Sequence, residues 1–110
     1  MCQIFAGQAP ERYAYETRSI RLGGHVTSVR LEKAYWDILE DVASAQDMPL
    51  GRFLTTLHNE VLELRGEAQN FTSLLRCACL TYIEQIQGNA DEELILKTEA
   101  QSREKVSLPA

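Results

Sequence analysis

A short alternating segment that leads directly into two helical segments constrains this chain more than any other feature of its sequence. The segment TSVRL would place Val29 and Leu31 on one face of an extended strand. Ser28 and Arg30 would then lie on the opposite face. A lone strand cannot pair with itself, and two helices do not cover a core this apolar. The order strand, helix, tight turn, helix therefore predicts that a second copy of the chain supplies the missing partner.

The two helices after this strand are predicted from apolar residues at spacings of three and four. The first runs from about Glu32 or Lys33 to Gln46, and Trp36 is predicted to be a core residue on its apolar side. Pro49 suits the first turn of the second helix, where its missing N–H costs nothing. The apolar side of the first helix consists of Tyr35, Trp36, Leu39, Val42 and Ala43. The second helix is expected to bury Phe53, Leu54, Leu57, Val61 and Leu64, and to end at Gly66.

A third helix is predicted between a cap at Asn70 or Thr72 and a stop at Gly88. Its apolar side consists of Leu74, Leu75, Ala78, Tyr82, Ile83 and Ile86. We expect an N-terminal arm over residues 1–16, a domain over residues 17–88, and an acidic, flexible tail over residues 89–110 that holds at most a brief, frayed helix. No internal repeat or low-complexity tract is evident.

Two glycines, Gly23 and Gly24, separate the alternating segments RSIRL and HVTSVRL. A glycine pair in this position favours a two-residue hairpin turn, because the primed turns of hairpins need positive φ. The competing interpretation is one long strand with a bend at the glycines. We favour the hairpin.

The composition indicates one soluble globular domain. The chain has 110 residues, of which 45% are hydrophobic and 25% charged. No apolar run is long enough for a membrane span, and the N-terminus lacks the pattern of a signal peptide. We therefore expect a cytoplasmic protein with no membrane partner. The three cysteines make an odd number, and we expect them to be reduced.

The net charge of −5 argues against a nucleic-acid partner until its distribution is considered. Residues 1–30 carry four arginines and two acidic residues, a balance of +2. Residues 31–110 carry seven basic and fourteen acidic residues, a balance of −7. The positive charge thus lies in and before the predicted strand, and an acidic body that points away from DNA is compatible with binding.

The sequence resembles the ribbon-helix-helix family of DNA-binding dimers, through the core pattern over about residues 25–64 with its strand ending in VRLE. The runs TRSIRLGGHVTSVRLE, LGRFLTTLHNEVLE and NFTSLLRCACLTYIE look like a bacterial subfamily, mostly uncharacterised, with an added C-terminal helix. Members sometimes carry an aryl-sulfate sulfotransferase name. This chain is far too short for a large catalytic fold, and it has no glycine-rich phosphate loop that opens a helix. The resemblance implies a mainly α fold with a short β-ribbon, assembled as a homodimer or a higher oligomer.

In this family, paired strands enter the DNA major groove, and alternate strand residues contact base edges. The resemblance therefore implies that Val26, Ser28 and Arg30 face the groove, with Arg30 a candidate for bidentate contact with guanine. Thr27, Val29 and Leu31 would face the core. The start of the second helix would bind a backbone phosphate through Gly51 and Arg52. A hairpin would turn the ribbon into a four-stranded sheet, which either widens the DNA surface, with Arg18 and Arg21 contributing, or blocks insertion into the groove.

Other chemistry finds little support in the sequence. His25 and His58 lie in different elements with no ligand cluster, so no metal or cofactor is predicted. Cys77 and Cys79 are two apart on a helix, and their side chains diverge too far to share a metal or a disulfide. We interpret both as small, buried or half-buried hydrophobes, whereas Cys2 has no assigned role. No catalytic constellation is evident. A DNA-binding transcriptional regulator is the leading interpretation, a dimerisation or protein-interaction module without DNA binding the second, and an enzyme a distant third.

Overall fold

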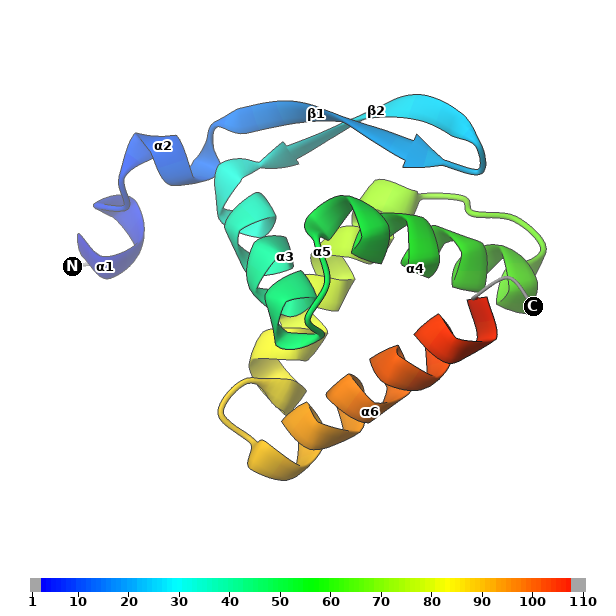
Figure 1. Cartoon of the computed structure of the whole chain (residues 1–110). Coiled ribbons are helices and arrows are strands. Elements are labelled where there is room, and N and C mark those ends of the chain that lie inside the picture. Colours follow the sequence, from blue (N-terminus) through cyan, green and yellow to red (C-terminus); the bar gives the residue numbers. More distant parts are fainter. Residues whose placement is uncertain (1–2, 108–110) are drawn as a thin grey trace.

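The chain folds into one two-stranded antiparallel ribbon and a set of helices, which confirms the predicted mainly helical fold (Figure 1). The computed structural model describes the backbone of residues 3–107 and the side chains of residues 3–102. The elements follow in the order α1 (Gln3–Ala6), α2 (Pro10–Tyr13), β1 (Tyr15–Leu22), β2 (His25–Glu32), α3 (Lys33–Ala45), α4 (Leu50–Arg65), α5 (Phe71–Thr81), the π-helical segment η1 (Tyr82–Ile86) and α6 (Ala90–Ser107).

The ribbon is the predicted hairpin. β1 and β2 pair in register from Tyr15 opposite Glu32 to Leu22 opposite His25. The turn between them uses Gly23 at φ +59° and Gly24 at φ +82°, values that side chains with a Cβ rarely adopt. The alternative of one long bent strand is therefore wrong.

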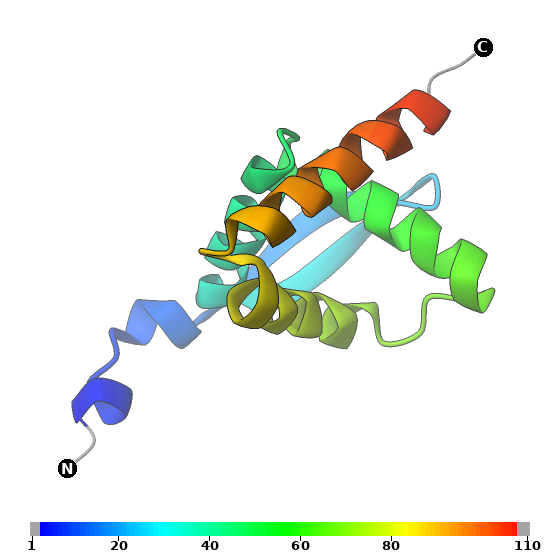
Figure 2. The ribbon, with the colours of Figure 1, turned by 90° about the horizontal axis from the view of Figure 1, so that it is seen from below.

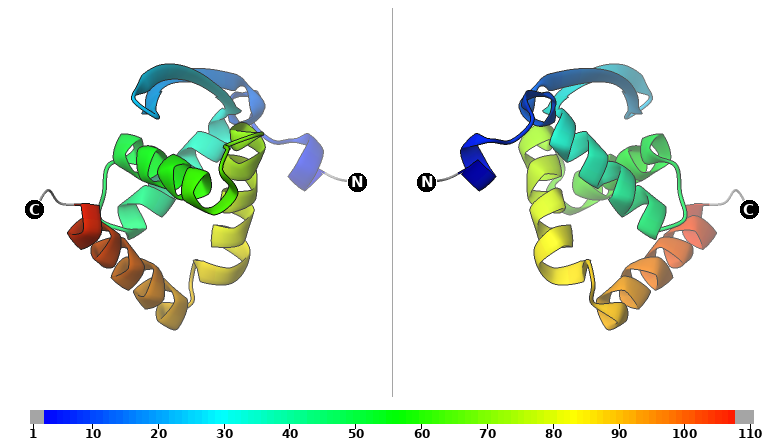
Figure 3. Two further views of the ribbon diagram at one scale, coloured as in Figure 1. Left: turned by 90° about the vertical axis from the view of Figure 1, so that its right-hand side faces the viewer. Right: turned by 90° about the vertical axis from the view of Figure 1, so that its left-hand side faces the viewer.

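One face of the ribbon covers the helices, and the hydrophobic core lies beneath it. Figure 3 shows the ribbon arched over one side of the helices, with α5 and α6 converging on the opposite side. The predicted core residues Val29 and Leu31 are buried, and β1 adds two more inward residues at alternate positions. The ribbon's inner apolar residues are Ile20, Leu22, Val29 and Leu31.

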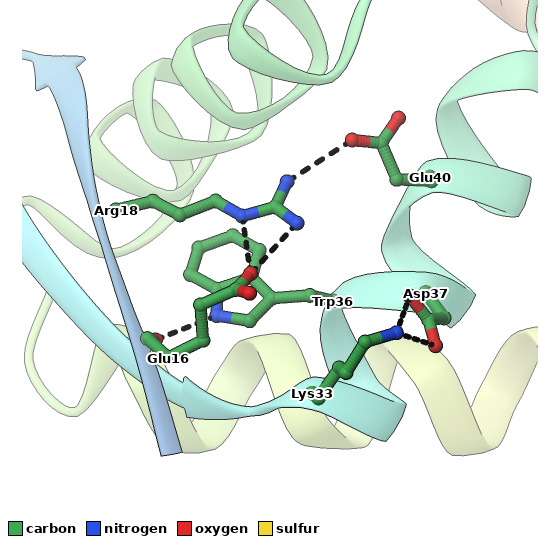
Figure 4. Close-up of polar contacts among 6 residues, drawn as sticks. All are labelled: Glu16, Arg18, Lys33, Trp36, Asp37 and Glu40. Atoms are coloured by element: carbon green, nitrogen blue, oxygen red, sulfur yellow. Dashed lines mark hydrogen bonds and ion pairs between the residues drawn. The ribbon is translucent and has the colours of Figure 1, made fainter. Parts of the chain in front are cut away.

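Trp36 is a core residue, as predicted, with no exposed surface. Its indole Nε1–H donates a hydrogen bond of 2.8 Å to the carbonyl oxygen of Glu16 on β1 (Figure 4). The Arg18 guanidinium lies 4.7 Å from the centroid of the Trp36 ring and makes ion pairs with Glu16 at 2.8 Å and Glu40 at 3.1 Å. These contacts fix the start of β1 against α3.

The strand partner of β2 comes from the same chain. A second copy is predicted on the grounds that this strand has no partner and that two helices cannot cover the core. β1 supplies the partner, and α5 covers part of the core with Leu75 and Cys79, both fully buried. The dimer remains a prediction, but it no longer rests on an unpaired strand.

The helical stripe of α4 is buried in its first half only. Phe53 and Leu54 are buried and Leu57 and Val61 half-buried, whereas Leu64 is 79% exposed, so its predicted burial is wrong in the single chain. Helical spacing gives the direction of a side chain but does not show whether another element covers it. Pro49 precedes the helix in an extended conformation rather than occupying its first turn. Gly66 ends the helix, as predicted, with φ at +79°.

The third predicted helix is observed as α5 followed by η1. Leu75 and Tyr82 on its apolar side are buried, but Ile83, within η1, is exposed, so its predicted place on the apolar side does not bury it. The predicted flexible tail is instead the helix α6. Its buried Ala100 and the ion pair of 3.2 Å between Lys97 and Asp47 attach it to the body.

The predicted N-terminal arm contains two single-turn helices (Figure 2), of which α2 contacts α3 and α1 lies farther from the body. Both Ile4 and Phe5 on α1 are exposed. The arm ends slightly earlier than predicted, because β1 begins at Tyr15. Cys2 lies outside the described residues. None of the described helices has the length and hydropathy that a membrane span requires.

Candidate nucleic-acid interface

The outer face of the ribbon gathers the polar side chains of both strands. In an antiparallel pair, directly opposite residues point to the same face, and each strand alternates between faces. The observed register therefore assigns one set of residues to the outer face: Tyr15, Thr17, Ser19 and Arg21 from β1, and Val26, Ser28, Arg30 and Glu32 from β2. All of these side chains except the half-buried Glu32 are exposed.

The three residues predicted to face a DNA groove lie together on this face. Val26, Ser28 and Arg30 occupy alternate positions of β2, and all three are exposed. Val26 keeps 65% of its surface exposed although it is apolar. Thr27 is predicted to face the core; its pairing with Ile20 places it on the inner face, but its side chain is exposed.

The first strand adds outer-face residues that the sequence analysis did not propose. Thr17 lies opposite Arg30, and Ser19 lies opposite Ser28. Both carry hydroxyl groups that can donate or accept hydrogen bonds. The alternation in TRSIRL, combined with a two-residue turn at the glycines, would have been enough to find them.

The two outer-face arginines are each held by a neighbour. The Arg30 guanidinium lies 4.3 Å from the centroid of the Tyr15 ring, a distance at which the cation is attracted to the aromatic face. Arg21 Nη1 donates a hydrogen bond of 3.4 Å to the carbonyl oxygen of Gly24. Because both side chains remain exposed, their planar donor groups stay accessible.

Glu32 is the single acidic residue of the outer face, and an arginine from α5 neutralises it. Arg76 Nη2 and Nε lie 2.9 and 3.3 Å from Glu32 Oε1. This hydrogen bonding from Arg76 lowers the pKa of the Glu32 carboxyl below its ordinary value. The carboxylate stays ionised, and the positive charge of Arg76 on the added helix offsets the negative charge that would oppose a phosphate backbone.

Arg18 is separated from this group by the sheet itself. Arg18 and Arg21 are both predicted as additional DNA contacts, but of the two only Arg21 lies on the outer face. Arg18 lies on the inner side, stacked on Trp36 and paired with Glu16 and Glu40. Its guanidinium supports the attachment of β1 to α3 (Figure 4).

The predicted phosphate site lies at the first turn of α4, which is attached to β1. Thr55 Oγ1 lies 2.7 Å from the carbonyl oxygen of Arg21 and 3.0 Å from that of Gly51, so one hydroxyl joins the strand to the helix. Gly51 and Arg52 are both exposed. A Cβ added at Gly51 would meet no atom within 4 Å, so the space beside this residue is open, and the phosphate site stays a prediction.

The remaining candidates for chemistry are dispersed. Burial raises the pKa of the Cys79 thiol to about 11, so this cysteine is protonated and behaves as a small hydrophobe. Cys77 is exposed, which corrects its predicted burial. His58 packs edge-on against Phe71, with 5.1 Å between ring centroids. Among the described residues, no group of three or more histidine, cysteine and acidic side chains could hold a metal ion.

Comparison with known proteins identifies the fold. Residues 15–83 match the family described as Ribbon-helix-helix domain, from the start of β1 into η1. An uncharacterized protein from Bordetella pertussis Tohama I is similar in structure, with a TM-score of 0.79 and 38% sequence identity over 100% of this chain and 90% of that chain. No functionally curated protein matches. Ribbon-helix-helix domains typically bind DNA as dimers and are generally non-enzymatic. The chain belongs to the ribbon-helix-helix domain family.

Proposed function

We propose that this chain is a DNA-binding transcriptional regulator that inserts the outer face of the β1–β2 ribbon into the major groove. The observation that carries the proposal is the composition of this face. Its exposed side chains are two arginines, hydroxyl residues, one valine and Tyr15, and its one carboxylate is neutralised by Arg76. Such side chains read base edges by hydrogen bonding and by apolar contact.

Three residues of β2 have distinct proposed roles. Arg30 donates two parallel hydrogen bonds to the O6 and N7 atoms of a guanine. Ser28 contacts either a purine or a pyrimidine edge, and Val26 contacts a thymine methyl group. The Tyr15 ring lies against the Arg30 guanidinium and limits the orientations of this side chain before binding. Arg30 therefore loses less conformational freedom when it contacts DNA.

The first turn of α4 is the proposed phosphate contact. Its N–H groups and helix dipole favour an anion, and Arg52 adds a positive charge. The Thr55 hydroxyl holds this turn against β1 at Arg21. A phosphate contact here fixes the position of the ribbon in the groove but carries no base preference.

The width of the ribbon favours a single hairpin as the inserted element. Neighbouring strands lie about 4.8 Å apart, so the outer strands of a four-stranded sheet would be about 14 Å apart. That span exceeds the groove width of about 12 Å, whereas a two-stranded ribbon fits. We therefore propose that each chain inserts its own hairpin and that β1 contributes to the surface rather than blocking it.

We further propose that the protein acts as a homodimer in the bacterial cytoplasm, without catalytic activity. The dimer is supported by the typical behaviour of the family and by the exposed end of the α4 stripe at Leu64. A cytoplasmic location follows from the proposal itself, because the chromosome that the ribbon would bind lies there. The chain's net charge of −5 implies weak nonspecific binding.

Fluorescence anisotropy with labelled duplexes tests the proposal. The full chain is titrated with duplexes from the region upstream of its own coding sequence and with a scrambled duplex, between about 50 and 200 mM salt. We expect binding that Arg30→Ala weakens by about 1–3 kcal/mol on the cognate duplex and less on the scrambled one. Arg65→Ala, on the last turn of α4, is the control. Absence of binding at the lowest salt concentration would favour a protein-interaction module instead.

A further inference from the structure

Arg76 of α5 lies at the base of the ribbon, which is the end formed by the strand pair Tyr15 and Glu32. Its Nη2 atom lies 2.9 Å from Glu32 Oε1, and its guanidinium lies 5.8 Å from the centroid of the Tyr35 ring. The Arg76 side chain keeps 30% of its surface exposed. The added helix therefore places a solvent-accessible cation beside the outer face, where the ribbon ends.

The Arg76 guanidinium keeps hydrogen-bond donors for a further ligand. Its hydrogen bonds to the described residues use Nε and Nη2, and both go to one oxygen, Glu32 Oε1. A guanidinium has five N–H donors in a fixed planar arrangement. The two N–H groups of Nη1 are therefore left for an anion, and phosphate oxygens are acceptors that this planar group matches.

Glu32 orients this arginine. Two hydrogen bonds from one guanidinium to one carboxylate limit the conformations of a long side chain. Hydrogen bonding to Glu32, with smaller effects of the nearby Tyr15 and Tyr35 side chains, raises the pKa of Arg76 above its ordinary value. A phosphate that binds here therefore meets a cation whose position is already fixed, and its binding costs less side-chain freedom.

Two helices, α4 and α5, reach different strands of the ribbon and different ends of it. α4 packs against β1, and the Thr55 hydroxyl binds the carbonyl oxygen of Arg21 near the hairpin turn. α5 packs against β2, and Arg76 binds Glu32 at the ribbon base. Arg21 lies opposite Val26, which is six residues from Glu32, or about 20 Å along an extended strand. The first turn of α4 and Arg76 therefore lie near opposite ends of the ribbon.

We propose that Arg76 makes a second phosphate contact, so that each chain of the homodimer is fixed to DNA near both ends of its ribbon. This inference rests on the proposed function, in which the first turn of α4 contacts a phosphate near the hairpin turn. A span of about 20 Å exceeds the groove width of about 12 Å, so the two contacts reach phosphates that are separated along the groove. One contact sets the position of the ribbon, and two contacts also set its direction in the groove.

A different role for Arg76 is to offset the negative charge of Glu32 without any contact to DNA. Arg76→Ala alone leaves an unpaired carboxylate beside the outer face, which weakens DNA binding in either role. The double variant Glu32→Gln, Arg76→Ala removes one negative and one positive charge, so the net charge of the chain stays at −5. Its affinity for DNA therefore reports whether a phosphate contact has been lost.

Anisotropy titrations with the cognate and scrambled duplexes at several salt concentrations test this inference. The full chain, Arg76→Ala, Glu32→Gln and the double variant are compared, and melting curves verify that each is folded. Lys97→Ala is the matched control, because it changes the net charge by the same amount as Arg76→Ala. Lys97 also pairs with a carboxylate, that of Asp47 at 3.2 Å, but it belongs to α6, on the side of the helices opposite to the ribbon (Figure 3).

We expect Arg76→Ala and the double variant each to lower the slope of log affinity against log salt by about one. Both should weaken binding to the two duplexes alike, by roughly 5- to 10-fold at about 100 mM salt. Glu32→Gln and Lys97→Ala should keep the wild-type slope. A double variant with the wild-type slope and affinity would show that Arg76 only offsets Glu32, which would overturn this inference and leave the proposed function intact. Absence of DNA binding by the wild-type chain at the lowest salt concentration would overturn both.

Discussion

The two faces of the β1–β2 ribbon share one backbone but differ in the burial of their aliphatic side chains and in the side chains they present. The inner face carries four buried aliphatic side chains and rests on the helices. The outer face carries exposed arginine and hydroxyl side chains, and even its one aliphatic residue, Val26, is 65% exposed. Because a strand alternates between faces, neighbouring residues serve separate purposes. The comparison indicates that stability and recognition can be changed independently in this element.

The largest effect is expected beneath the inner face. Trp36→Ala should lower the free energy of unfolding by about 3–5 kcal/mol, because the indole is fully buried and its hydrogen bond to Glu16 is lost. Thermal and urea unfolding measure this loss. Tyr13→Ala removes an aromatic ring that is 60% exposed and serves as the control. A melting temperature within a degree or two of the wild type would show that Trp36 does not support the ribbon.

Two residues on opposite faces of β2 test the comparison directly. Leu31→Ala should cost about 2–5 kcal/mol of stability, because the side chain has no exposed surface. Ser28→Ala should change stability by less than about 0.5 kcal/mol, because its side chain is exposed. Urea unfolding measures both losses of stability. If Leu31→Ala and Ser28→Ala lowered the free energy of unfolding equally, both faces of the ribbon would be packed, as they would be within an unrecognised assembly.

The salt dependence of DNA affinity should distinguish a phosphate contact from a base contact. Arg52→Ala should weaken binding to all duplexes alike and lower the slope of log affinity against log salt by about one, because it removes a phosphate contact. Arg30→Ala should relax base choice instead. Anisotropy titrations at several salt concentrations give both quantities. If Arg52→Ala changed the preference among duplexes, its assignment as a phosphate contact would be wrong.

The smallest effect is expected at the ion pair between Glu32 and Arg76. The lowered pKa of Glu32 means that this pair stabilises the protein above the ordinary glutamate pKa of about 4.3. That contribution is lost as the pH falls through the folded-state pKa, which lies below this value. Glu32→Gln should therefore reduce stability at pH 7 by less than about 1 kcal/mol. The difference in the free energy of unfolding between Glu32→Gln and the wild type should vanish in acid. A difference that persists in acid would show that the substitution acts through packing and not through the ion pair.

Much of the fold could be predicted because it depends on local signals. The alternation in TSVRL, the glycine pair and the helical stripe around Trp36 each appear in a few consecutive residues. The helix α6 was missed although its signals are local too. Asn89 accepts a hydrogen bond of 3.2 Å from the N–H of Glu92, and acidic residues fill the first turn, where the helix dipole favours them.

The parts that could not be predicted depend on contacts between distant segments. Helical spacing put Leu64 and Ile83 on apolar faces, but only the packed chain shows that neither is covered. The charge of Arg18 suggested a DNA contact until the register placed it on the inner face beside Trp36. The pairing of Thr17 with Arg30 follows from the two-residue turn, which the sequence favoured but left open beside the alternative of one bent strand.

The central claim is that the outer face of the ribbon contacts DNA, and amide chemical shifts measure this most directly. The isotope-labelled full chain is titrated with a duplex from its own upstream region at about 50 mM salt. We predict shifts at Thr17, Ser19, Arg21, Ser28 and Arg30 and at the first turn of α4, with α6 unchanged. Shifts confined to α5 and α6, or no shifts at all, would contradict the claim.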